Sequence, residues 1–175
     1  FALLFLKFQF VDSNLVFSEK ILSMYALYAV YIFILVFTFF YDLHYLKVAD
    51  EILLPAILIG LIATLATPLT PHVFDALIGA AIGVAFFGIQ ILVSRGTWVG
   101  MGDLRIGAFM GVILGWKLIL VALFISYLLG SVISIIIVLR KKQFFGIKIP
   151  FAPFLVIGTF IAIFVGEEIL KWYLL

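Results

Sequence analysis

The sequence predicts an all-α membrane protein, a polytopic bundle of about six to seven transmembrane helices. The first reason is composition: 67% of the 175 residues are hydrophobic and 11% are charged. In a soluble domain about a quarter of the residues are charged. The second reason is that several apolar runs exceed the ~18 residues that mark a spanning helix. The third is that the charged residues gather in short segments between these runs.

Short polar or glycine-bearing segments divide the chain into successive apolar runs. The first run, residues 1–10, is expected to be the tail of a helix that starts before Phe1, so that an N-terminal part of the full protein is missing. The later spans are expected over residues 24–40, 52–66, 73–93, 107–116 and 118–139 (one or two spans), and 149–165. No long linker is visible, so residues 1–175 are expected to form a single transmembrane domain.

Glycines recur at helical spacing in two of these runs. Gly79 and Gly83 lie four residues apart, as do Gly107, Gly111 and Gly115. Rows of small residues allow helix backbones to approach closely in lipid. We therefore expect these glycines to form packing seams between helices.

The basic residues are distributed unequally between the two sets of connecting segments. The segments at 41–51, 94–105 and 140–148 carry seven Lys and Arg residues, and the alternate set carries three, Lys20, Lys117 and Lys171. Cytoplasmic segments carry the excess of positive charge in membrane proteins. This bias predicts that the first set is cytoplasmic, and with it both Asp42 and Asp103.

Net charge, cysteine content and histidine positions argue against several classes of function. A net charge of +2 is too small to suggest a nucleic-acid partner. The chain has no cysteine, so neither a disulfide framework nor a thiolate metal site is expected. His44 and His72 fall on opposite sides of the predicted membrane, so no histidine cluster for zinc is expected either.

Two acids stand at the ends of apolar runs. Asp42 closes one run, and Asp103 opens another just after Gly100 and Gly102. A carboxylate at a membrane surface is costly and points to a functional site, although Asp103 alone is also compatible with a helix N-cap. Two carboxylates that share a site cannot both ionise easily, so the pair can hold one proton. Such a pair can hydrolyse a peptide bond without a metal, one acid acting as general base and the other as general acid.

Three motifs in order resemble those of the type IV prepilin peptidases. Asp42 is followed eight residues later by Asp50, as in the first motif of that family. The second motif, Gly-x-Gly-Asp followed by an apolar residue and Lys or Arg, is matched by residues 100–105, and its acid lies 61 residues after Asp42. The third, a family run Ile-Pro-Phe-Gly-Pro-Phe, is matched by residues 149–154.

This resemblance implies an intramembrane-type aspartic peptidase with Asp42 and Asp103 as its catalytic pair. The implied substrates are type IV prepilins and pseudopilins, whose short basic leader is cut after a glycine at the cytoplasmic face of the bacterial inner membrane. A supporting or substrate-binding part is expected for residues in the motifs or beside them: Gly100, Gly102, Asp50, Glu51, Arg105, Pro150 and Pro153. Asp50 and Glu51 suit the first turn of a helix, and contact with the basic leader is the weaker alternative for them.

The chain departs from the family pattern in three places. Ala49 stands where the family usually has proline, and Ala152 where glycine is common. An N-terminal region with paired Cys-x-x-Cys motifs, found in many bacterial members, does not occur in this sequence. We expect no cofactor for proteolysis; S-adenosylmethionine is expected only if the full-length protein also methylates.

Two other classes of membrane protein share part of this pattern. A presenilin or signal-peptide-peptidase relative also pairs Tyr-Asp with Gly-x-Gly-Asp, but its Pro-Ala-Leu motif is not matched by residues 150–153. A proton-coupled transporter also uses intramembrane acids, but usually shows an internal repeat and acids near the midplane. No convincing repeat is present, and Asp42 and Asp103 fall at the ends of spans.

Overall fold

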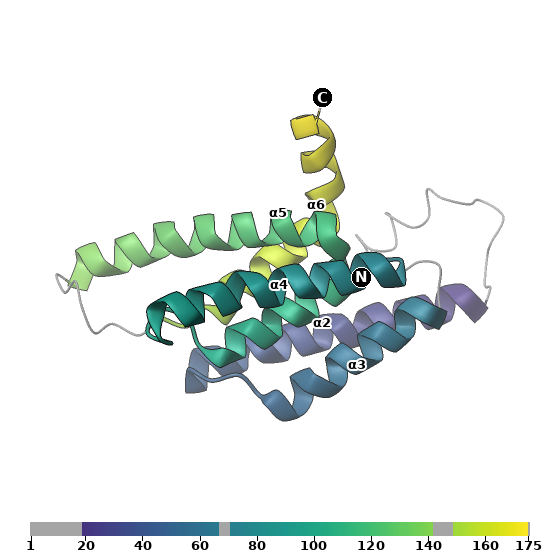
Figure 1. Ribbon diagram of the computed structural model, residues 1–175, viewed down its shortest axis with the longest axis horizontal. Helices are drawn as coiled ribbons and strands as arrows, with labels where there is room; N and C mark the ends of the chain where they lie inside the picture. Colours follow the sequence, from purple (N-terminus) through teal and green to yellow (C-terminus); the bar gives the residue numbers. More distant parts are fainter. Residues whose placement is uncertain (1–18, 67–70, 142–148, 175) are drawn as a thin grey trace.

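The computed structural model describes residues 19–66, 71–141 and 149–174, and these form an all-helical bundle. The helices are α2 (Glu19–Tyr45), α3 (Asp50–Ala66), α4 (Val73–Ser94), α5 (Met101–Lys141) and α6 (Ala152–Leu174) (Figure 1). The predicted all-α class is confirmed. The run at residues 1–10 lies outside the described residues.

Within the described residues, four helices are long and apolar enough to cross a membrane: Tyr25–Tyr45, Val73–Ser94, Met101–Arg140 and Ala152–Tyr173. Helix α3 has 17 residues and is shorter than these spans. Several helices extend further than the apolar runs indicate; among them, α2 continues to Tyr45 and α5 begins at Met101. Both extensions carry an acid into the helix, because hydropathy marks the apolar part of a helix and not the end of its backbone hydrogen bonding.

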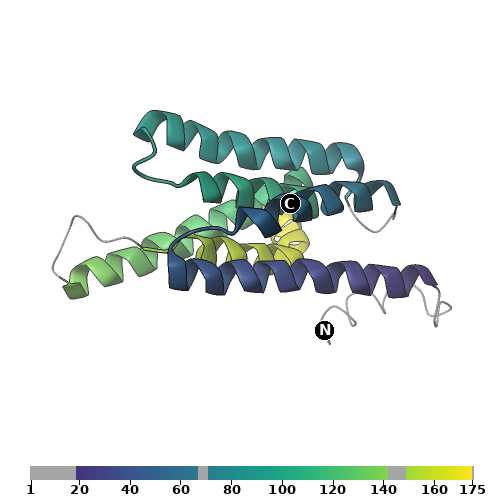
Figure 2. The same ribbon diagram turned by 90° about the horizontal axis from the view of Figure 1, so that it is seen from below.

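The predicted division near residues 115–117 occurs at Gly115, where α5 changes direction. Gly115 has φ 71° and ψ 176°, a conformation that is essentially restricted to glycine. The chain doubles back there, so that α5 consists of two helices that run in opposite directions (Figures 1 and 2). The second of these lies beside α6 (Figure 1).

Replacing Gly115 by alanine is expected to destabilise this reversal. An alanine at such backbone angles costs about 1–3 kcal/mol, and its Cβ would also lie 3.2 Å from Cβ of Pro71. We expect the free energy of unfolding in detergent to fall by about this amount. An unchanged unfolding midpoint would contradict the strained geometry assigned to Gly115.

Helices α4 and α5 touch through their backbones. A Cβ added at Gly83 would overlap the backbone of Gly107, and one added at Gly111 would overlap the backbone of Gly79. The fully buried ring of Phe87 packs against Gly107 as well. The glycine rows are therefore the packing seam that their spacing predicts, and this seam fixes the first half of α5 against α4.

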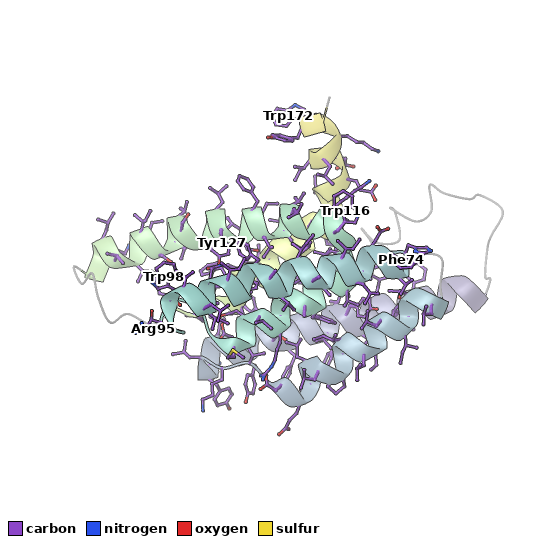
Figure 3. The ribbon with its side chains drawn as sticks, viewed as in Figure 1. Phe74, Arg95, Trp98, Trp116, Tyr127 and Trp172 are labelled. Carbon is purple, nitrogen blue, oxygen red and sulfur yellow. The ribbon has the colours of Figure 1, made fainter. Side chains whose placement is uncertain are left out.

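One end of the bundle gathers the helix ends that matter for the site. The last turns of α2 and α4 and the first turns of α3, α5 and α6 lie toward the left of Figure 1. Arg95 and Trp98 mark this end in Figure 3, and Phe74 and Trp116 lie toward the opposite end. Asp42 and Asp103 therefore belong to the same end of the bundle, as the alternation of connecting segments predicts.

Candidate active site

Asp42 lies one turn before the end of α2 and is buried, with 7% of its surface exposed. Its Oδ2 accepts a hydrogen bond of 3.0 Å from the backbone N–H of Ala152, the first residue of α6. The next residue, Pro153, has no N–H, and the N–H groups of Phe154 and Leu155 bond to an oxygen within their own turn. Asp42 thus satisfies a free donor at the positive end of a second helix.

This contact gives the third motif, residues 149–154, a structural role: it forms the start of the helix that binds Asp42. The sequence alone does not indicate this role. Asp42 and Ala152 are separated by 110 residues, and no periodic pattern connects them. Pro153 is buried in the first turn of α6, where proline is favoured, and Pro150 is half-buried just before it. The two prolines therefore shape the start of the helix whose first N–H holds Asp42.

Asp103 is the third residue of α5 and is half-buried. Its Oδ2 accepts a 3.2 Å hydrogen bond from the backbone N–H of Gly100, which precedes the helix. The expectation that Asp103 is the N-cap is therefore wrong, because the helix begins two residues earlier, at Met101. Asp103 instead reaches back from the third helical position, as the acid of a capping box does.

The structure brings the two acids together from separate helices. Asp42 and Asp103 interact electrostatically, each held by a backbone N–H at the start of a helix, Ala152 for one and Gly100 for the other. Two acids that interact in this way do not both ionise as easily as either would alone.

A polar pair beside Asp103 was not identified from the sequence. The Tyr127 hydroxyl donates a 2.8 Å hydrogen bond to Oε1 of Gln90, joining α4 to the second part of α5 (Figure 3). Tyr127 also interacts electrostatically with Asp103, and its ring packs against Phe151 at 5.0 Å between centroids. The sequence offers one indication of this pair: Gln90 is a polar amide within an apolar run, where it needs a hydrogen-bond partner.

The two motif glycines differ in their surroundings. A Cβ at Gly102 would overlap Cγ2 of Val48 and lie 2.7 Å from Cβ of Val48. A Cβ at Gly100 would be in ordinary contact, 3.8 Å from Oδ2 of Asp103. Close packing thus requires glycine at 102, whereas nothing in the structure explains a glycine at 100.

Asp50 and Arg105, both expected near the site, form an ion pair with each other. Asp50 begins α3, and Arg105 lies two residues after Asp103 in α5. Glu51 is exposed in the first turn of α3. In residues 19–66, 71–141 and 149–174, no three His, Cys, Asp or Glu side chains are grouped as metal ligands.

Comparison with known proteins gives one family. The sequence model of the type IV leader peptidase family matches residues 13–135, which include both acids. Three curated relatives are each named prepilin leader peptidase/N-methyltransferase. The protein of Aeromonas salmonicida (strain A449) is 32% identical over 81% of this chain and 50% of its own length. The protein of Legionella pneumophila is 32% identical over 90% of this chain and 55% of its own length. The protein of Bacillus subtilis (strain 168) is 30% identical over 83% of this chain and 58% of its own length.

The chain spans about half the length of these curated relatives, between 50% and 58%. No solved structure matches it. The family match covers more than half of the chain, and the apolar helices are those of a multi-pass membrane protein. This chain belongs to the type IV leader peptidase family.

Proposed function

We propose that this chain is a membrane aspartic endopeptidase that cleaves the leader of type IV prepilins or pseudopilins, with Asp42 and Asp103 as its catalytic residues. The observation that carries the proposal is geometric: α2 and α5 bring the two acids to one end of the bundle, and each accepts a hydrogen bond from a backbone N–H, Asp42 from Ala152 and Asp103 from Gly100. Family membership supports the class of reaction. It also favours a peptidase over a proton-coupled transporter and over a presenilin relative.

The proposed reaction uses one shared proton. The ionised carboxylate takes a proton from a water molecule while the water oxygen attacks the scissile carbonyl carbon. The protonated carboxyl gives its proton to the carbonyl oxygen, which forms a tetrahedral gem-diol. Collapse of this intermediate breaks the C–N bond: the first acid, now protonated, gives its proton to the leaving amine, and a hydroxyl group of the gem-diol returns its proton to the second acid. The roles of base and acid stay open between Asp42 and Asp103.

The backbone donors serve this chemistry by holding the two acids still. Each acid accepts a hydrogen bond from a main-chain N–H through one oxygen, Asp42 from Ala152 and Asp103 from Gly100. A carboxylate has two oxygens, so the other oxygen of each acid is left for water and substrate. Such positioning accounts for a large part of enzymatic rate acceleration.

We further propose that cleavage occurs at the cytoplasmic face of the bacterial inner membrane. The excess of Lys and Arg in the segments 41–51, 94–105 and 140–148 over the alternate set supports that orientation. The precursor's apolar helix would lie in lipid beside the bundle, with the glycine before it at the two acids. The relatives' printed names include N-methyltransferase; we propose only the peptidase activity for this chain, a reaction that two carboxylates and water can perform without a cofactor.

A cleavage assay tests the proposal. The chain, reconstituted in lipid, is mixed with a precursor that has a basic leader, a glycine and an apolar helix, and the products are identified by mass spectrometry. We expect two products: the leader ending in glycine, and the remainder of the precursor beginning at the next residue. An intact precursor would contradict the proposed peptidase. Proton uptake into the vesicles without cleavage would in addition favour a transporter.

A further inference from the structure

We infer that Asp50 and Arg105 are positioning residues: their ion pair fastens the connection between α2 and α3 to the start of α5 and so holds Asp42 in register with Asp103. The inference rests on the proposed function and assigns these residues a part in the same site. It differs from the weaker of the two interpretations drawn from the sequence, in which Asp50 meets the basic leader of the substrate.

The connection between α2 and α3 is short and begins immediately after the site. Only residues 46–49 join Tyr45, the last residue of α2, to Asp50, the first residue of α3. Leu46 adopts φ 52°, and its N–H donates a 2.8 Å hydrogen bond to the backbone oxygen of Asp42. A displacement of this connection would therefore act directly on the turn of α2 that carries Asp42.

The same connection contacts α5 on both sides of Asp103. Val48 packs against Gly102, where no Cβ would fit, and Asp50 pairs with Arg105. These contacts fall one residue before and two residues after Asp103. The first turns of α5 are thus joined to the end of α2 by one apolar contact and one charged contact.

The carboxylate of Asp50 depends on Arg105 for its compensating charge. The side chains of Arg105 and Asp50 are 31% and 43% exposed. Oδ1 of Asp50 is shielded from solvent and has no hydrogen-bond partner among the described residues. Removal of Arg105 therefore leaves a partly shielded carboxylate without its compensating charge, which is more costly than removal of both partners together.

The test measures kcat and KM for precursor cleavage by variants of the reconstituted chain. We expect Arg105→Gln to lower kcat by about 10- to 100-fold, the typical effect of misplaced catalytic groups. KM should stay within about twofold, because the loss concerns positioning and not substrate binding. The double variant Asp50→Asn/Arg105→Gln should recover part of the lost kcat, and the reversed pair Asp50→Arg/Arg105→Asp should recover more. The matched control is Glu168→Gln, an exposed acid in the last part of α6, which should leave both constants unchanged.

A second pair of variants tests the apolar contact and does not depend on the ion pair. Gly102→Ala should lower kcat, because its Cβ displaces Val48, and adding Val48→Gly should restore kcat by removing the overlapping atoms. An Arg105→Gln variant with unchanged kcat and raised KM, or an absence of recovery in both sets of double variants, would overturn the inference. These outcomes leave the proposed function standing as long as the unaltered chain cleaves the precursor. An unaltered chain that leaves the precursor intact overturns both.

Discussion

Replacing Asp103 by asparagine is expected to abolish precursor cleavage, with a loss of at least about 1,000-fold in kcat. Asparagine neither takes a proton from water nor gives one to a carbonyl oxygen at neutral pH. Its side-chain oxygen can still accept the hydrogen bond from the Gly100 N–H, so the start of α5 should keep its geometry. Asp42→Asn should behave in the same way, with its oxygen on the Ala152 N–H. Cleavage rates in lipid vesicles measure both effects.

The double variant Asp42→Asn/Asp103→Asn sharpens this prediction. Residues that act as one unit give strongly non-additive losses, so the double variant should be no less active than either single variant. Glu168→Gln, an exposed acid remote in sequence from both motifs, should retain full activity. An Asp103→Asn variant that processes precursor at a near-normal rate would contradict the assignment.

The largest effect on folding is expected for alanine at Gly83. Its Cβ would overlap the oxygen and carbonyl carbon of Gly107, and a backbone cannot move aside as a flexible side chain can. Overpacking of this kind typically costs about 1–3 kcal/mol and occasionally more. We expect a clear fall in the free energy of unfolding in detergent, or loss of folded protein. Because α5 carries Asp103, activity should fall with it.

Gly88 provides the matched control on the same helix. A Cβ at this position meets only the end of the Leu104 side chain, at 3.8 Å, which is ordinary van der Waals contact. Gly88→Ala should therefore be tolerated and should gain slightly from the higher helix propensity of alanine. Equal unfolding midpoints for Gly83→Ala and Gly88→Ala would show that α4 and α5 do not touch through their backbones at Gly83.

Features that depend on local composition could be predicted from the sequence. Apolar runs and their polar boundaries predict the helices, the spacing of Gly79, Gly83, Gly107 and Gly111 predicts the seam, and the break at Gly115 follows from a glycine in a long apolar run. The two acids were singled out because a carboxylate next to an apolar run is costly. Their motif spacing then indicated the family, which the comparisons confirm.

Features that depend on contacts between distant segments could not be predicted. The N–H of Ala152 reaches Asp42 across 110 residues, and the Asp50–Arg105 ion pair joins two helices that the sequence does not register against each other. Val48 contacts Gly102 two residues after Leu46, which adopts φ 52°, a backbone conformation that favours glycine. Such contacts follow from the three-dimensional packing of helices whose individual sequences are nearly uniformly apolar.

A structure with a bound substrate analogue would show whether Asp42 and Asp103 act together on one water molecule. A structure of the chain would be determined with a bound precursor analogue in which a hydroxyl-bearing tetrahedral carbon replaces the scissile carbonyl. We expect the carboxyl groups of Asp42 and Asp103 both to lie within hydrogen-bond distance of that hydroxyl group, one from each side. An analogue bound with its hydroxyl group in contact with only one of the acids, or with neither, would contradict the claim.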